Sequence, residues 1–195
     1  MTITTDKLTF AEYLKYNDGT DRRYELVNGE LIPMSLGTGQ HGAIIKFIER
    51  ILEAEIATIN SDWVVLPGLI GVRSPRGGRW DTCRIPDVTV IPSQQWLTLQ
   101  TCEAVIEFTE SPPLLVIEVI SESTKSVDYK AKRNEYGVLE IPEYWIVDPL
   151  LAKITIFTLN EGWYEPVEFM GGELIQSATF PNLHPSVDLI LRQQI

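Results

Sequence analysis

The sequence predicts an α/β fold in which one mixed sheet carries helices on both faces. Apolar residues recur at helical spacing over residues 40–59, which predicts the longest helix of the chain. Residues 114–120 read LLVIEVI, an almost continuous aliphatic run that is typical of a strand covered on both faces. A polar segment of helical character (126–139) then separates this run from another strand, EYWIVD (143–148).

The elements around the long helix follow from local signals. Residues 8–17 predict a short amphipathic helix capped by Thr9. The segment RRYELVNGELIPM (22–34) contains two extended runs around Asn28-Gly29, a strong hairpin signal. After the helix, DWVVLPGLIGVR (62–73) is interpreted as one extended run that leads into a loop rich in glycine and arginine (74–80).

The second half of the chain continues the pattern. Residues 85–91 predict a strand, and Pro142 lies just beyond the polar helix. KITIFTL (153–159) and YEPVEFM (164–170) predict a terminal hairpin around Glu161-Gly162. From residue 40 the order is therefore helix, strand, strand, strand, helix, strand. No repeat or linker divides the chain, so residues 1–195 are expected to form a single domain.

Composition limits the function classes. An apolar fraction of 44% and a charged fraction of 22% are those of a globular protein. Because no signal peptide or membrane span is recognisable, we expect a cytoplasmic protein without membrane contacts. The two cysteines, Cys83 and Cys102, make a disulfide framework or a thiolate zinc cluster unlikely. The two histidines, His41 and His184, are too few for a His-rich metal site. A metal site would therefore use oxygen ligands, which favours Mg²⁺, Mn²⁺ or Ca²⁺.

The net charge of −11 argues against nonspecific nucleic-acid binding over the whole surface. Half of the sixteen basic residues nevertheless lie in two short windows, Arg73, Arg76, Arg79 and Arg84 in one, and Lys125, Lys130, Lys132 and Arg133 in the other. Two solvated, charge-balanced surfaces and two nucleic-acid contacts are both compatible with this pattern.

Glu118 interrupts the buried strand LLVIEVI. An unpaired buried carboxylate costs several kcal/mol, so Glu118 needs a cation or a basic partner. A structural salt bridge to an arginine, or a strand end that reaches solvent, would be the plainer explanation. Asp87 follows Pro86 near a strand start, where an Asp is commonly a turn or cap residue. If the two acids lie at the same height on neighbouring strands, they can share one hard cation.

Three further residues have a structural interpretation beside the functional one. Lys132 lies four residues after Asp128, as in an ordinary surface ion pair on a helix. His41 stands at the start of the long helix and can be a partly buried, hydrogen-bonded histidine. Glu25 can be an exposed strand residue.

The glycines Gly37, Gly39 and Gly42 spell G-x-G-x-x-G before a helix. A dinucleotide site would require a buried parallel strand before this motif and an acid that ends the next strand. The preceding ELIPMS is short and contains Pro33, and Asp62 precedes the next strand. A flexible entry to the helix is the simpler interpretation.

The chain resembles the Uma-two family of endonucleases in a set of motifs and in their order. The motifs are IPDV (85–88), IEVISEST (117–124), then Asp128, Lys132 and Tyr136, and finally EYWIVDP (143–149). This family is a branch of the restriction-endonuclease-like PD-(D/E)XK superfamily. YELVNGEL (24–31) and His41 also look like features of the family, and the likeness runs from about Leu8 to Val187. The resemblance implies a restriction-endonuclease-like core with the element order given above.

The resemblance also implies residue roles. Asp87 and Glu118 would bind Mg²⁺ or Mn²⁺, with the Val119 carbonyl as a further ligand. The superfamily lysine normally lies two residues after the acid of the third strand, where this chain has Ile120. In this family a lysine of the following helix takes the basic role, and Lys132 corresponds to it. Glu25 and His41 would be additional site residues.

The implied reaction is metal-assisted hydrolysis of DNA phosphodiester bonds. Arg73, Arg76 and Arg79 on one side, and Lys130 and Arg133 on the other, would contact the nucleic acid. A homodimer is compatible with cutting two strands. Two alternative functions stay open. The first is a catalytically silent nuclease-fold module that binds nucleic acid or protein. The second is a two-carboxylate glycosidase, for which the sequence shows no sugar-stacking cluster of tryptophans.

Overall fold

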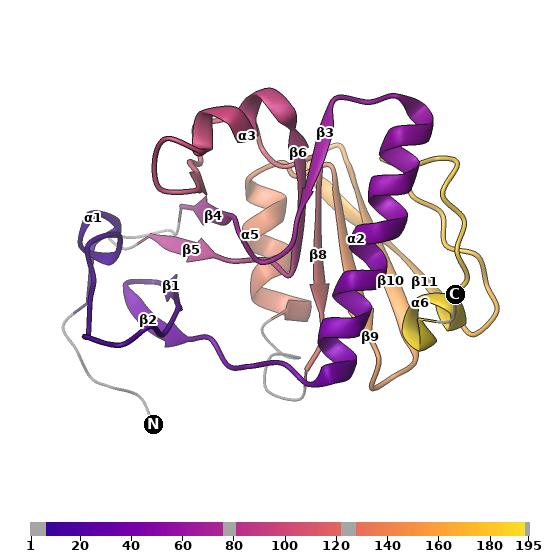
Figure 1. Cartoon of the computed structure of the whole chain (residues 1–195), viewed down its shortest axis with the longest axis horizontal. Helices are drawn as coiled ribbons and strands as arrows, with labels where there is room; N and C mark the ends of the chain where they lie inside the picture. The colour runs from indigo at the N-terminus through magenta and orange to yellow at the C-terminus, as the bar shows by residue number, and fades with distance from the viewer. Residues whose placement is uncertain (1–6, 76–80, 122–127, 194–195) are drawn as a thin grey trace.

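A six-stranded mixed sheet forms the centre of the computed structural model, which describes residues 7–75, 81–121 and 128–193 (Figure 1). The β8–β9 pair is parallel and the other pairs are antiparallel. In spatial order the strands are β11 (Trp163–Met170), β10 (Lys153–Asn160), β9 (Glu143–Asp148), β8 (Leu115–Val119), β6 (Val88–Pro92) and β3 (Trp63–Leu66).

Helices cover both faces of this sheet, as predicted (Figure 1). The long helix α2 (Gly39–Ile59) and the short α6 (Val187–Arg192) pack on one face. The opposite face is covered by α5 (Arg133–Val138), which continues the π-helix η1 (Asp128–Lys132), and by α3 (Ser93–Leu99). Apart from α3 and the strands of a second sheet, the order from α2 is α2, β3, β6, β8, η1–α5 and β9, so the predicted core order of helix, three strands, helix and strand is confirmed.

All five residues of β8 are buried, and they alternate between the two faces. Leu115, Ile117 and Val119 join the cluster under α2, whereas Val116 and the following Ile120 join the cluster under α5. Because successive strand residues point to opposite faces, Glu118 lies on the α5 side. The sequence LLVIEVI therefore has apolar neighbours on both faces, as expected.

A second sheet of five short strands was not predicted. It contains the N-terminal hairpin, which the sequence did predict around Asn28-Gly29. Both turn residues have positive φ, 50° and 81°, as a two-residue type I′ turn requires. In spatial order the strands are β2 (Glu30–Pro33), β1 (Tyr24–Val27), β5 (Thr82–Arg84), β4 (Gly71–Ser74) and β7 (Val105–Ile106).

Two sequence predictions in the N-terminal half are wrong in extent. The single extended run over 62–73 is two strands, β3 and β4, which belong to different sheets because the chain turns at Pro67-Gly68, where Gly68 has a φ of 57°. The helix over 8–17 is a single turn, α1 (Phe10–Tyr13), although Thr9 does cap it, with a reciprocal capping box to Glu12.

The C-terminal hairpin β10–β11 is confirmed, with Glu161 and Gly162 at φ of 48° and 83° in its turn. The elements α3, β7 and α6 had no expectation from the sequence, since each is too short to show a clear period. No helix in the described part of the chain is both long and apolar enough to cross a membrane.

The two cysteines differ in accessibility, which gives a simple test of the packing. Cys83 is buried between the second sheet and α1, and burial followed by the negative charge of Glu25 raises the pKa of its thiol to about 12. Cys102 is exposed. At pH 8 we expect one thiol of the folded protein to react rapidly with dithionitrobenzoate, and the second only in denaturant. Rapid reaction of both thiols in the native protein would contradict the packing.

Candidate active site

The two acids singled out in the sequence lie opposite each other across two neighbouring strands. The antiparallel register of β6 and β8 pairs Val88 with Ile117, which places Asp87, one residue earlier, opposite Glu118. The Val119 N–H donates to Asp87 Oδ2 at 2.7 Å and fixes this carboxylate at the strand end. Asp87 is half-buried, whereas Glu118 is only 3% exposed.

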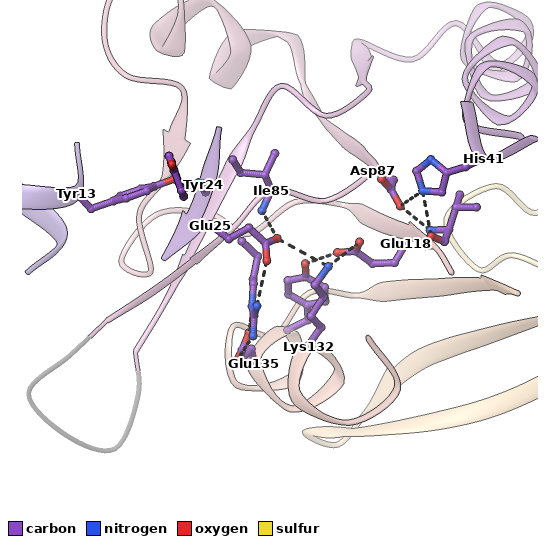
Figure 2. Close-up of polar contacts among 12 residues, drawn as sticks. Tyr13, Tyr24, Glu25, His41, Ile85, Asp87, Glu118, Lys132 and Glu135 are labelled. Atoms are coloured by element: carbon purple, nitrogen blue, oxygen red, sulfur yellow. Dashed lines mark hydrogen bonds and ion pairs between the residues drawn. The ribbon is translucent and has the colours of Figure 1, made fainter. Parts of the chain in front are cut away.

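Glu118 has a basic partner, as its burial requires. Lys132 Nζ lies 2.8 Å from Glu118 Oε2, and the Tyr136 hydroxyl donates to Glu118 Oε1 at 2.7 Å (Figure 2). Lys132 and Tyr136 are four residues apart at the junction of η1 and α5, so both side chains reach the same face of the sheet. Its partners thus include a lysine and a tyrosine of the helical segment that follows β8.

Lys132 is the last residue of the π-helix η1. Such turns occur mostly as short insertions in α-helices and frequently at functional sites. Ile120, at the position of the usual superfamily lysine, is buried in the apolar cluster under α5. The ammonium group beside Glu118 therefore comes from the helix and not from the strand. The side chain of Asp128, the other member of the expected surface pair, lies outside the described residues.

Glu25 is buried, contrary to its plainer interpretation as an exposed strand residue. Its Oε1 accepts the Ile85 N–H at 3.0 Å and lies 3.8 Å from Lys132 Nζ, and its Oε2 lies 3.0 Å from Arg84 (Figure 2). Arg84 also donates two hydrogen bonds to Glu135, at 2.7 and 3.1 Å. Glu25 thus connects the second sheet to Lys132 and to α5.

Arg84 is the centre of this buried network, with a side chain only 3% exposed. Burial alone would lower the pKa of its guanidinium, but the hydrogen bond and charge of Glu135, together with Glu25, outweigh burial and raise the pKa. The group therefore keeps its charge, as two buried carboxylates require.

His41 is in the first turn of α2, where the Thr38 hydroxyl caps its backbone N–H at 3.1 Å. The imidazole is half-buried and points at the end of β8 and at Asp87 (Figure 2). Its Nε2 lies 3.1 Å from the Val119 carbonyl oxygen and 3.3 Å from Asp87 Oδ2. The structure thus brings His41 to the same strand ends as Asp87 and Val119.

The predicted nucleic-acid contacts have different surroundings. Arg73 is paired with Asp81 and Glu107, and its guanidinium stacks over Phe10 and Phe108, 4.1 and 5.0 Å from the ring centroids. A phosphate would have to compete with two carboxylates for it. Lys130 and Arg133 are exposed. Arg76 and Arg79, and also Lys125, lie outside the described residues.

Three residues of the site were not singled out by sequence reasoning: Arg84, Glu135 and Tyr136. Arg84 belonged to a basic window whose other members were expected to contact DNA. Tyr136 formed part of the family motif, but its bond to Glu118 had no separate signal. Burial, followed by the negative charge of Glu118, raises the pKa of Tyr136 well above its usual value, so the hydroxyl remains a donor.

The donor set at the strand ends consists of two carboxylates and one backbone carbonyl, which is the chemistry of a Mg²⁺ or Mn²⁺ site. Both oxygens of Glu118 already accept from Lys132 and Tyr136, but a carboxylate has about four lone-pair sites, so capacity for an ion remains. In the described ranges, no three His, Cys, Asp or Glu side chains already converge as metal ligands. The fit to an ion thus rests on the oxygen chemistry of the donors and on their positions at neighbouring strand ends.

Comparison with known proteins agrees with the fold and shows the family. A family model described as Uma2, putative restriction endonuclease, matches residues 10–189, nearly the whole chain. The chain belongs to the Uma2 family. The resemblance seen in the sequence is thereby confirmed, and the family description supports a nuclease.

Relatives of this Uma2 member extend the comparison. A crystal structure described as a putative nuclease belonging to DUF820, from Anabaena variabilis, superposes with a TM-score of 0.74 at 18% identity. The match covers 95% of this chain and 98% of the other, and at this identity it shows the fold. The uncharacterized protein sll1609 of Synechocystis sp. is 26% identical over 152 residues, which are 77% of this chain and 80% of the relative.

Proposed function

We propose that this Uma2-family chain is a divalent-metal-dependent endonuclease that hydrolyses DNA phosphodiester bonds, with Asp87, Glu118 and Lys132 in its active site. The observation that carries the proposal is the contact of Lys132 Nζ with Glu118 Oε2 at 2.8 Å, next to the strand end at Asp87. A buried lysine lies there beside Glu118, and Asp87 lies opposite Glu118 at the end of the neighbouring strand.

Asp87, Glu118 and the Val119 carbonyl would hold the ion. When bound, Mg²⁺ or Mn²⁺ supplies positive charge to the phosphate and lowers the pKa of a coordinated water. Asp87 is held in place for this task by the Val119 N–H. Its position at the edge of the buried core keeps it half-exposed, so a phosphate can approach.

Lys132 would orient the attacking water or stabilise the negative charge that develops on the phosphate oxygens. Glu118 and Glu25 hold its ammonium group from two sides, at 2.8 and 3.8 Å, so little reorganisation is needed during the reaction. The Tyr136 hydroxyl donates to the other oxygen of Glu118 and fixes the rotation of that carboxylate.

The test is cleavage of supercoiled plasmid DNA with Mg²⁺ or Mn²⁺, measured as conversion to the nicked and linear forms. We expect EDTA to abolish cleavage and Asp87→Asn to lower its rate by about 10²-fold or more, since the substitution removes a charged ligand. Calorimetry on the same samples should show that Asp87→Asn loses metal binding together with cleavage. Cleavage that survives both EDTA and Asp87→Asn would overturn the proposal.

The alternative function is a catalytically silent module that binds nucleic acid or protein. Its support is the engagement of both Glu118 oxygens by Lys132 and Tyr136, together with a net charge of −11. DNA binding without metal-dependent cleavage, in protein shown to be folded, would favour this function over the nuclease.

Lys130 and Arg133 are exposed basic residues close to Lys132 in the same helical segment, so we expect them to contact the DNA backbone. Replacing both by glutamate should weaken DNA affinity and reduce the slope of log K against log salt by about one per residue removed. Arg73→Gln is the comparison, because the carboxylates and aromatic rings around Arg73 make it a structural residue. Fluorescence anisotropy over a salt series measures the DNA affinity and the salt slope of each variant. An unchanged slope in the double variant would exclude this face.

A further inference from the structure

The strand β3 is an edge of the central sheet and has one open side. In the described ranges it pairs with β6 alone. Just before the strand begins, the Ser93 N–H donates to the Asp62 carbonyl at 3.0 Å. Because antiparallel neighbours alternate between residues that exchange hydrogen bonds and residues that do not, Val64 also directs its backbone toward β6. The N–H and C=O groups of Trp63 and Val65 therefore point away from the sheet, toward the open side.

A groove of about 450 Å³ lies along this edge. Figure 1 shows β3 between α3 and α2, and each of the two helices contributes to a wall of the groove. The lining comprises Glu53, Ile56 and Ala57 of α2, Trp96 of α3 and the four residues of β3. Apart from Glu53 these residues are apolar. Unpaired backbone groups and apolar side chains thus lie together, as on the sheet edges to which a further strand is added.

The other sheet edges of the described structure are protected against such pairing. Proline, charged side chains and short strands are the usual means of protection. The opposite edge of the central sheet, β11, has Pro166 in its middle, between Glu165 and Glu168. In the second sheet, the edge strand β2 begins at Glu30 and ends at Pro33, and β7 has only two residues. The sequence of β3 is WVVL, which contains neither a proline nor a charge.

We propose that β3 pairs with the β3 strand of a second copy of this chain, in an antiparallel contact with two-fold symmetry. The direction of the backbone groups fixes the register. Trp63 lies opposite Val65 of the second copy, and each such pair exchanges two hydrogen bonds. Val64 then lies on the two-fold axis, opposite its own counterpart. The two central sheets become one continuous sheet across the contact.

A second copy is the occupant that ends the growth of the sheet. The joined sheet has the protected strand β11 at both of its outer edges. Contact through the same patch on both subunits gives a closed dimer, which is the commonest form of oligomer. The net charge of −11 on each chain opposes association. Salt screens this repulsion over about 8 Å at physiological ionic strength, and apart from Glu53 the groove is uncharged.

The first test is the mass of the full chain in solution, measured by analytical ultracentrifugation. We expect twice the 22.1 kDa of one chain at concentrations of about 100 µM, with dissociation on dilution. Val64→Lys places two like charges opposite each other on the axis, so it should raise the dissociation constant of the dimer by about tenfold or more. Val167→Lys is the matched control, because it makes the same change at an exposed valine of β11 and should leave the constant unchanged. Circular dichroism verifies that both variants are folded.

The second test is a disulfide across the two-fold axis, which leaves the contact uncharged. Directly opposed residues that do not exchange hydrogen bonds have Cα atoms about 4.5 Å apart, within the range of a disulfide. The background is Cys102→Ser, which removes the exposed native thiol. In this background Val64→Cys should form a covalent dimer on mild oxidation, whereas Val167→Cys should stay a single chain on a non-reducing gel.

A chain that is monomeric over the whole concentration range, and whose Val64→Cys variant forms no covalent dimer, would overturn the inference. A dimer whose dissociation constant is the same in folded Val64→Lys would also overturn it, because that dimer would use another surface. Asp87, Glu118 and Lys132 do not line the groove. The mass and the cross-link are measured without DNA cleavage, so the dimer and the proposed nuclease activity can each fail alone.

Discussion

Lys132→Met should lower metal-dependent DNA cleavage by about 10² to 10⁴-fold, the range expected when a positioned cation is removed from a site of phosphate chemistry. Methionine keeps the length and most of the volume of the side chain, so the change removes mainly the charge that lies between Glu118 and Glu25. Initial rates of plasmid nicking at saturating Mg²⁺ measure the effect.

The control for this prediction is Lys46→Met, which removes an exposed lysine of α2 that pairs with Glu49. It should cleave as the wild type does. Because Lys132 is buried, its loss also destabilises the fold, and the assays need a temperature at which circular dichroism shows the variant to be native. A folded Lys132→Met protein that cleaves within about threefold of the wild-type rate would remove Lys132 from the reaction.

Arg84→Met should lower the free energy of unfolding by about 3–5 kcal/mol, which is a large part of the stability of an ordinary domain. The variant leaves the carboxylates of Glu25 and Glu135 buried without their shared cation. Removing one member of a buried ion network is costly, because the remaining buried charges are less well compensated. Urea denaturation followed by circular dichroism measures the loss.

Two further variants separate charge from shape at this position. Arg84→Lys keeps the charge but cannot reproduce the fork that donates to Glu135 twice and to Glu25 once, so it should recover only part of the stability. Glu135→Leu in the Arg84→Met background removes one of the two acids that lost their shared cation, and it should also restore part of the free energy of unfolding. A loss below about 1 kcal/mol in Arg84→Met would mean that the network is not important for stability.

The main sheet and its helices could be predicted because their signals are local and long. The apolar period of α2 extends over 21 residues, and β8 is aliphatic except for Glu118. The second sheet could not be predicted, because its strands have two to four residues and pair with distant segments. Leu26 of β1, for example, pairs with Cys83 of β5. No pattern within either segment indicates such a contact.

The site residues likewise divide into those that a local signal identified and those that depend on the fold. An acid in the middle of a buried strand requires a partner, which made Glu118 recognisable from its surroundings alone. Lys132 followed only from the family resemblance, since its spacing from Asp128 is that of any surface pair. Arg84 could not be separated from Arg73 in one basic window, because only the fold decides which arginine faces inward. The structure buries Arg84 and leaves Arg73 partly exposed, although each arginine pairs with two carboxylates.

The placement of Lys132 on the crossover helix separates two tasks that a single strand usually combines. The groups that we propose to hold the ion lie at strand ends of the sheet, whereas the ammonium belongs to the helical segment after β8. Central strands generally open only on global unfolding, while helix ends open locally at lower free energy. Metal affinity and turnover can therefore be lost at different temperatures. Natural sequence variation can likewise alter the helix and its lysine without disturbing strand register, so that catalytic rate can evolve independently of metal affinity.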